Sequence, residues 1–295
     1  MKKIAVISHD AGGAEILSNW LKKKKYLYST VLRGPAKKVF KKNNIEINDN
    51  ELIVAIKNSE YIITGTSWQS NLEKEAIFFA NKLGKYTITF LDHWVNYEER
   101  FIYKGKLTLP NEIWVTDKFA FKLAKNTFRE TIVKMKHNDY LINLKKIIKE
   151  KSLLHKKNFA NQGLFIGENI SEHALLTTGD INGFGYTEKE ALKFLLDNIN
   201  NLKININNLK IRPHPSEKKA KYNWARDTKL VKDISNEKDL IDDILESDII
   251  FGCESNAMIV GVFARKKVIS CIPNFKKKCS LPYPQIIYLR NLLLK

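Results

Sequence analysis

The stretch IAVISHDAGG, residues 4–13, joins four consecutive apolar residues directly to polar ones and a pair of glycines. Over the following positions, 14–25, apolar side chains recur three and four residues apart, which is typical of one face of a helix. A short apolar strand that turns straight into an amphipathic helix is the opening unit of a parallel sheet covered on both faces. The stretch therefore predicts an α/β fold whose first strand is buried.

The same alternation of strand and helix continues along the first half of the chain. Residues 138–158 differ, because an amphipathic stripe there passes into a polar segment, which predicts a helix and then a linker. Before that point the pattern predicts strands at 28–32, 61–64, 86–91 and 112–115, and helices at 71–83 and 118–125.

A second alternating unit begins after the linker with a predicted strand at 164–167. Thr187 and Glu190 have the capping-box spacing that starts a helix. Helices at 239–246 and 257–264 and a strand at 268–271 are predicted to follow. We therefore expect two Rossmann-like domains, residues 1–155 and 156–295, with a cleft between them.

The composition is that of a globular protein of 295 residues, 44% of them apolar. No run approaches the roughly 18 apolar residues of a membrane-spanning helix, and the apolar run before His9 is too short for a signal peptide. Cys253, Cys271 and Cys279 lack the paired spacing of a zinc site. We expect a reduced, cytoplasmic protein without a metal centre.

The formal net charge of +18 bears on the partners of the protein. Such a charge suits nucleic acid, an anionic membrane surface or an anionic substrate. Because the lysines are scattered along a chain rich in Lys, Asn and Ile, a general compositional bias is the simpler explanation. No nucleic-acid-binding module is recognisable, so nucleic acid is not an expected partner. Peripheral contact with the inner face of a membrane through basic surface stays open.

Polar residues follow the first strand, where ligands of open α/β sheets bind. Asp10 is a candidate general base for an acceptor hydroxyl, or else the cap of the next helix. Gly12 and Gly13 would let a ligand approach the helix N-terminus, whose free N–H groups suit an anion. The fingerprint G-x-G-x-x-G is missing, so a dinucleotide site is not expected.

Two later strand ends of the first half carry hydroxyl, acidic and aromatic side chains that suit the binding of a sugar-like acceptor. The hydroxyls could equally cap the next helix. The second loop could also be structural, with Trp94 packed and Asp92 paired with Arg100. The candidate acceptor-binding residues are Thr66, Ser67, Asp92, His93 and Trp94.

In the second half, the sequence RPHP at 212–215 follows a strand-like run. The flanking prolines hold His214 in a stiff, non-helical backbone. An imidazole fixed at a strand end can hydrogen-bond a phosphate or protonate a departing one. Arg212 could add a bidentate phosphate contact, unless its place in the strand turns it to the other face.

The sequence GCESN at 252–256 follows another apolar run and precedes a helix. Backbone N–H groups and the Ser255 hydroxyl at this helix start would suit a phosphate, and Glu254 would suit ribose or sugar hydroxyls. The alternative is an ordinary cap beside a solvated Glu254. The candidate donor-binding residues are Gly12, Gly13, Glu168, Arg212, Glu254, Ser255 and Asn256.

These motifs resemble those of inverting glycosyltransferases with the GT-B architecture, and most of all the bacterial sialyltransferases and polysialyltransferases. HDAG at 9–12 is similar to their acidic-acidic-Gly motif, with His9 at the first acidic position and Ala11 ahead of the glycine. HP at 214–215 matches their His-Pro motif. Ser255 followed by Asn256 matches their Ser-Ser/Thr motif at its first position.

The resemblance implies an inverting, metal-independent glycosyltransferase that needs no cofactor. Its donor would be a nucleotide-sugar, in that family a sialic-acid-like sugar on CMP. Its acceptor would be a surface glycan or a lipid-linked one, as in capsule or lipopolysaccharide assembly. Asp10 would be the catalytic base, and His214 would contact the donor phosphate and help the leaving group depart.

Two other functions fit the same residues. A UDP-sugar 2-epimerase shares the architecture and uses carboxylates and histidines, and it would release a free epimerised sugar without any acceptor. A non-catalytic protein that binds nucleotides or nucleic acid is the third hypothesis, and the net charge is its support.

Overall fold

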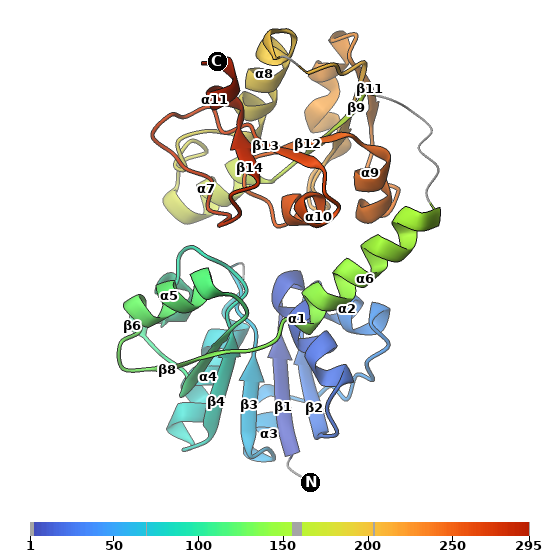
Figure 1. Ribbon diagram of the computed structural model, residues 1–295. Helices are drawn as coiled ribbons and strands as arrows, with labels where there is room; N and C mark the ends of the chain where they lie inside the picture. The colour runs from blue at the N-terminus through green and yellow to red at the C-terminus, as the bar shows by residue number, and fades with distance from the viewer. Residues whose placement is uncertain (1–2, 69, 155–160, 203, 295) are drawn as a thin grey trace. The chain divides into compact units, whose positions relative to one another are not determined.

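A computed structural model describes residues 3–68, 70–154, 161–202 and 204–294. The chain divides into two compact units, Met1–Asn143 and Leu144–Lys295 (Figure 1). Helix α6 (Asp139–Leu154) runs across the division. The domain boundary that we expect at residues 155 and 156, with the end of the predicted linker, lies outside the described residues.

The first unit is built on a sheet of six parallel strands in the order β2-β1-β3-β4-β7-β8. The predicted strands at 28–32, 61–64, 86–91 and 112–115 all belong to it, and β8 was not predicted. The strands are β1 (Lys3–Ser8), β2 (Leu27–Leu32), β3 (Tyr61–Thr64), β4 (Tyr86–Phe90), β7 (Glu112–Val115) and β8 (Ile132–Met135).

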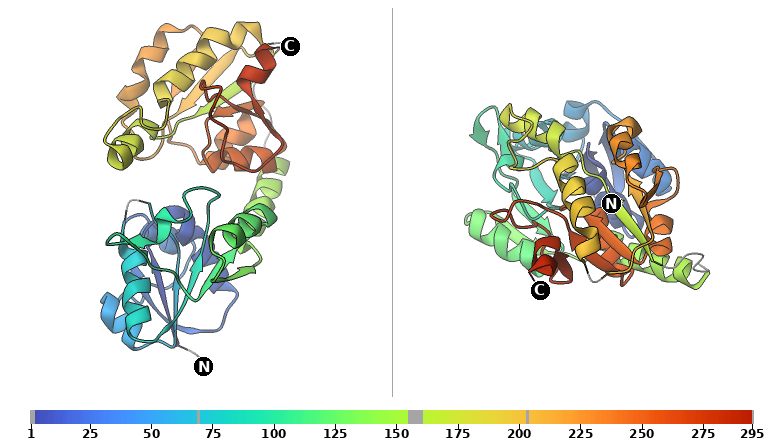
Figure 2. Two further views of the ribbon diagram at one scale, coloured as in Figure 1. Left: turned by 90° about the vertical axis from the view of Figure 1, so that its left-hand side faces the viewer. Right: turned by 90° about the horizontal axis from the view of Figure 1, so that it is seen from above.

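Helices cover both faces of this sheet (Figure 2). Successive residues of a strand point to opposite faces, and so Val6 packs in the cluster of Trp20 and Trp114 whereas Ile7 packs in the cluster of Ile56 and Ala80. Burial on both faces is the reason why the sequence of β1 is continuously apolar. The helices are α1 (Ala11–Lys22), α2 (Ala36–Lys42), α3 (Leu52–Lys57), α4 (Leu72–Lys82) and α5 (Lys118–Thr127), and the short hairpin of β5 (Ile102–Tyr103) and β6 (Lys106–Leu107) precedes β7.

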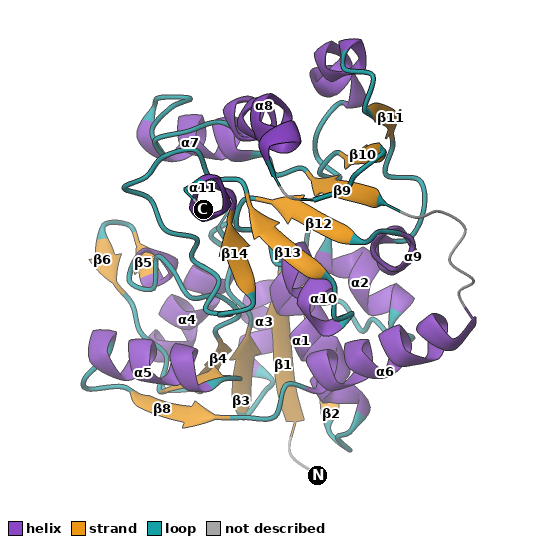
Figure 3. Cartoon of the chain, turned by 45° about the horizontal axis from the view of Figure 1, so that its top comes forward, coloured by secondary structure: helices purple, strands orange, loops and turns teal. Residues whose placement is uncertain are grey.

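The second unit also has six parallel strands, in the order β11-β10-β9-β12-β13-β14. Figure 3 shows β9, β12, β13 and β14 side by side. The strands are β9 (Gln162–Ile166), β10 (Asn208–Arg212), β11 (Val231–Ile234), β12 (Ile249–Gly252), β13 (Lys267–Ser270) and β14 (Ile286–Tyr288).

The helices of the second unit are α7 (Ile170–Thr178), α8 (Glu188–Asn198), α9 (Leu240–Glu246), α10 (Ala257–Phe263) and α11 (Leu289–Leu293). The predicted capping box is confirmed, because the Thr187 hydroxyl accepts from the Glu190 N–H and the Glu190 carboxylate accepts from the Thr187 N–H. Phe165 and Phe251, from adjacent strands, are fully buried and pack with Leu195 of α8.

Each sheet has one place where the strand order reverses direction. In the first unit it lies between β1 and β3, and in the second it lies between β9 and β12. Open α/β sheets bind ligands outside the carboxyl ends of the strands at such switch points. The predicted fold, an α/β chain of two Rossmann-like domains, is therefore confirmed, and each domain has a defined place to look for a site. No helix among the described residues is long and apolar enough to span a membrane.

Candidate functional site

The switch point of the first unit holds a His–Asp pair. Asp10 occupies the N-cap position of α1 with extended backbone, but its side chain makes no capping hydrogen bond. One carboxylate oxygen lies 2.7 Å from His9 Nδ1, and the other accepts the Trp68 N–H at 2.9 Å. The carboxylate of Asp10 is therefore oriented by neighbours on both sides of the switch point, and the capping alternative is not realised.

Two glycines bring the elements of this site into close contact. A Cβ atom at Gly13 would lie 3.2 Å from the Gly65 Cα, and one at Gly12 would lie 2.3 Å from Asp92 Oδ2. We expected Gly12 and Gly13 to make room for a ligand. In the structure they make room for the β3–α4 loop and for the Asp92 carboxylate.

Asp92, which follows β4, is the second carboxylate of the candidate site in the first unit. Its Oδ1 accepts the Thr66 hydroxyl at 2.9 Å, and the same hydroxyl accepts from Arg100 Nη1 at 3.1 Å. Arg100 Nη1 lies 4.0 Å from Asp92 Oδ1, and the two side chains are only 5% and 4% exposed. Asp92 and Thr66 thus form a buried network with Arg100, which includes the structural pairing considered from the sequence.

The other predicted acceptor residues lie at different depths. Ser67 is 2% exposed, so it belongs to the interior rather than to an open surface. His93 Nε2 is 3.5 Å from Asp92 Oδ2, and burial lowers the pKa of His93 although Asp92 opposes this. Trp94 packs at the edge of a hydrophobic cluster and donates its Nε1–H to Asp117 at 2.9 Å. The His93 side chain is half-buried, at 35% exposed, and lies beside the Asp92 carboxylate.

Glu73, in the first turn of α4, is a member of this site that the sequence analysis missed. Its Oε1 accepts the His9 N–H at 2.6 Å, directly behind the His9–Asp10 pair. Burial raises the pKa of Glu73 to about 7, and the nearby Asp10 charge adds to the effect. The sequence offered one signal for Glu73: it is an acidic residue next to the apolar Leu72, at the start of a helix that packs on a sheet.

The switch point of the second unit holds Glu168, which follows β9. Its Oε1 accepts three backbone N–H groups, from Cys253 at 3.1 Å, Glu254 at 2.7 Å and Ser255 at 2.6 Å. Burial raises the pKa of Glu168 to about 7, and Glu254 adds to the rise although the three N–H groups oppose it. The backbone groups that we expected to hold a phosphate are therefore bonded to a carboxylate of the protein itself.

Glu254 is held in place rather than solvated. Its Oε1 accepts from the Tyr186 hydroxyl at 3.0 Å and lies 3.3 Å from Lys277 Nζ, and its Oε2 accepts the Ser280 N–H at 3.2 Å. These contacts fasten the β13–β14 loop to the end of β12. The Ser255 hydroxyl accepts the Ala257 N–H at 3.2 Å and so caps α10, whereas the Asn256 side chain makes no capping bond.

His214 lies after β10, the strand next to β9, and its hydrogen bonds fix its tautomer. Nδ1 accepts the Ser216 N–H at 3.2 Å and lies 2.8 Å from the Ser216 hydroxyl, so in the neutral ring the proton is on Nε2. Ser216 also accepts from the Asn169 amide at 3.2 Å, which links β10 to the segment after β9. Burial lowers the pKa of His214, and His173 lowers it further. His214 is thus a neutral N–H donor at the strand ends.

Arg212 does not join Glu168, Glu254 and His214 at the strand ends. Its Nη1 contacts Asp243 Oδ2 at 2.5 Å and donates to the Lys238 carbonyl at 2.8 Å. Lys210, two residues earlier on β10, pairs with the other Asp243 oxygen at 2.9 Å. Since residues i and i+2 of a strand share a face, both cations point to α9, and Arg212 has a structural role instead of the phosphate contact that we expected.

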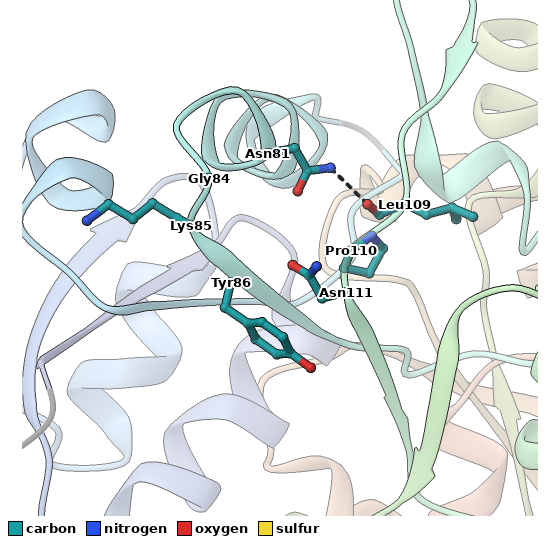
Figure 4. A pocket seen from close by; sticks show the side chains of 7 residues that line it. All are labelled: Asn81, Gly84, Lys85, Tyr86, Leu109, Pro110 and Asn111. Atoms are coloured by element: carbon teal, nitrogen blue, oxygen red, sulfur yellow. Dashed lines mark hydrogen bonds between the residues drawn. The ribbon is translucent and has the colours of Figure 1, made fainter.

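Two hollows of the first unit lie away from these residues. One of about 330 Å³ lies at the amino ends of β4 and β7, where Asn81 donates to the Leu109 carbonyl at 3.0 Å (Figure 4). Its neighbour of about 600 Å³ is lined by Tyr86, Trp114 and Lys134 among others. Neither contains a residue predicted from the sequence. Because ligands of such sheets bind at the opposite, carboxyl ends, we place the candidate site at the switch points.

Comparison with solved structures agrees with this architecture. The chain resembles UDP-GlcNAc 2-epimerase from Methanocaldococcus jannaschii over 99% of its own length and 90% of that chain, with a TM-score of 0.65 and 12% identity. HepE from Anabaena in complex with UDP-glucose matches over 92% of this chain and 80% of that one, with a TM-score of 0.57 and 12% identity.

A glycosyltransferase from Rickettsia africae matches over 91% of this chain and 79% of that one, with a TM-score of 0.52 and 15% identity. No protein-family model and no curated protein matches the sequence. At these identities the shared property is the fold, so the comparisons define the class: two Rossmann-like domains of the GT-B type.

Proposed function

We propose that this chain is a nucleotide-sugar-dependent glycosyltransferase in which Asp10 is the general base. The observation that carries the proposal is the geometry of Asp10. Its carboxylate stands at a switch point, bonded to His9 and to the Trp68 N–H and free of the helix that it precedes. A base must be held in hydrogen-bond reach of the proton that it removes, and such orientation supplies it.

The donor side of the proposal rests on the second unit. A neutral His214 with its proton on Nε2 can donate to a phosphate oxygen of the leaving nucleotide. UDP-GlcNAc and UDP-glucose are bound in structures with this fold, which supports a nucleotide-sugar as the donor. We propose that transfer inverts the sugar and needs neither a metal ion nor a cofactor, and that CMP- and UDP-sugars are the donors to test.

A UDP-sugar 2-epimerase is the second candidate. Epimerisation needs acid and base groups placed against the sugar. In the first unit Asp10 follows β1, Asp92 and His93 follow β4, and Asp92 Oδ2 lies against Gly12 of the β1–α1 turn. The M. jannaschii epimerase shares the fold over nearly the whole chain. Release of UDP and a free epimerised sugar from a UDP-sugar, with no acceptor present, would favour the epimerase over the transferase.

The test begins with thermal-shift measurements against CMP, CDP, UDP, GDP, ADP and NAD, followed by turnover of the matching sugar nucleotide with and without a glycan acceptor. Asp10→Asn should abolish transfer and leave nucleotide stabilisation intact, because the amide cannot take a proton. Asp227→Asn, at an exposed position, is the matched control. Full transfer by Asp10→Asn would exclude Asp10 as the base.

We further propose that the enzyme works in the cytoplasm and meets a lipid-linked acceptor at an anionic membrane surface. The exposed lysines of α5, Lys118, Lys122 and Lys125, flank Phe119 and Leu123, which are 59% and 37% exposed. A helix with basic and exposed apolar side chains suits the surface of an anionic bilayer.

Co-sedimentation with phosphatidylglycerol vesicles should detect this contact, and phosphatidylcholine vesicles should not bind. Lys122→Glu/Lys125→Glu should release the protein. Lys38→Glu/Lys41→Glu on α2 makes the same charge change where Val39 and Phe40 are buried, and should have a smaller effect. Equal losses from the two variants would mean that net charge alone drives binding.

A further inference from the structure

Glu73 is an acidic residue buried inside the first unit. It lies in the first turn of α4 and is 2% exposed, although it carries an ionisable group. Its Oε2 and the Ser67 Oγ are both buried, and neither atom makes a hydrogen bond within the described residues. A carboxyl group in such surroundings is costly to ionise, because burial removes its hydration and one backbone N–H donor replaces only part of it.

Among the described residues, the hydrogen-bond donor to the Glu73 carboxyl is the backbone N–H of His9, the residue directly before the candidate base Asp10. His9 N–H donates to Oε1 at 2.6 Å. Further along the same turn, the His9 ring contacts Asp10, and Asp10 accepts the Trp68 N–H. A change in Glu73 would therefore reach Asp10 through one peptide unit, without contact between Glu73 and a substrate.

The charged groups near Glu73 act on its ionisation in both directions. Asp10, from the β1–α1 turn, is of the same sign and raises the pKa of Glu73 further after burial has done so. Lys74, its neighbour on α4, has its own pKa lowered by burial and then by Arg100, whereas the Glu73 charge raises it. The His9 N–H acts in the other direction, because its hydrogen bond to Oε1 favours the charged form of Glu73.

We propose that Glu73 is a positioning residue for Asp10, which holds the His9 backbone from within the core as an uncharged carboxylic acid. Its Oε1 accepts the His9 N–H, and its proton is carried on Oε2, which faces the interior. A neutral Glu73 removes one negative charge from the surroundings of Asp10, so Glu73 does not compete with the base for a proton. This inference rests on the proposed function only in naming Asp10 as the base.

The first experiment does not depend on activity. Carboxyl ¹³C NMR of the Glu-labelled protein should show two resonances that titrate near pH 7, one from Glu168 and one from Glu73. The resonance that disappears in Glu73→Gln is that of Glu73. Glu75→Gln, in the same helical turn, is the matched control and should leave that resonance in place. A Glu73 resonance that titrates near pH 4.5 would overturn the proposal.

The positioning role needs variants that separate the acceptor from the charge. Glu73→Gln keeps an oxygen for the His9 N–H and should retain slow exchange of that amide, whereas Glu73→Leu removes the acceptor and should speed its exchange. If the chain is a transferase, Glu73→Leu should lower kcat with KM retained, and Glu73→Gln should restore most of kcat near pH 7.

The outcomes keep the two proposals apart. Loss of kcat in Glu73→Gln equal to that in Glu73→Leu would refute the uncharged acid, and unchanged His9 exchange in Glu73→Leu would refute the positioning role. If the wild type transfers no sugar, the titration and the amide exchange still decide both points for Glu73, and only the proposed function fails.

Discussion

Replacing His214 by alanine tests the donor site most directly. In the neutral ring the proton is on Nε2, because Nδ1 accepts from Ser216. One hydrogen bond to a charged phosphate is worth about 1.5–3 kcal/mol, so His214→Ala should weaken nucleotide binding by about 10–150-fold. Isothermal titration with UDP and CMP at pH 7.5 measures this. His137→Ala, at an exposed position, is the control for loss of an imidazole.

The pH dependence sharpens the same prediction. Burial lowers the pKa of His214, so the ring is neutral at pH 7 and above, and its contribution should be constant between pH 7 and 8.5. His214→Gln, which keeps an N–H donor, should recover part of the lost affinity. An unchanged Kd in His214→Ala, with the fold intact by circular dichroism, would remove His214 from the site. Affinity that falls steeply from pH 7 to 8.5 in the wild type alone would mean a charged imidazole instead.

Three further outcomes follow from the contacts described. Asp243→Ala leaves Lys210 and Arg212 without their buried partner, so it should destabilise the protein by about 3–5 kcal/mol in urea unfolding, and a loss no larger than that of exposed Asp227→Ala would contradict the structural role of Arg212. Burial raises the pKa of Glu168 from 4.5 to about 7, so its contribution to stability is present below pH 4.5 and lost as the pH rises through 7. Unfolding at pH 5 and 8 should therefore change the difference between wild type and Glu168→Gln by up to about 3 kcal/mol, and parallel profiles would argue against the shift. EDTA should leave sugar transfer unchanged, and strict dependence on a divalent ion would overturn the metal-independent mechanism.

The strands were predictable because a parallel strand covered on both faces must be apolar at every position. Ile4 to Ile7, Leu164 to Ile166 and Ile249 to Phe251 are continuous runs for this reason, and all three are buried strands. The Thr187 capping box was predictable because both of its hydrogen bonds are made within four residues. Local patterns of this kind carry their own physical cause.

The partners of the candidate site residues had no such local cause. Glu168 bonds the N–H groups of Cys253 to Ser255, and only the pairing of β9 with β12 brings these segments together. Asp10 could have capped α1, but its carboxylate accepts the Trp68 N–H instead, from the loop after the neighbouring strand β3. Which alternative was realised depended on contacts across the sheet.

By itself, then, the sequence determined the α/β class, the two domains, and the strand ends where Asp10, Asp92, Glu168 and His214 stand, because hydrophobic periodicity and turn residues act over a few positions. Only the tertiary structure decided what each side chain does there. It paired Arg212 with Asp243 and placed Glu168 against the backbone of the loop between β12 and α10. It also buried Glu73 behind His9. Hydrogen bonds and desolvation depend on which segments become neighbours, and that is decided when the whole sheet assembles.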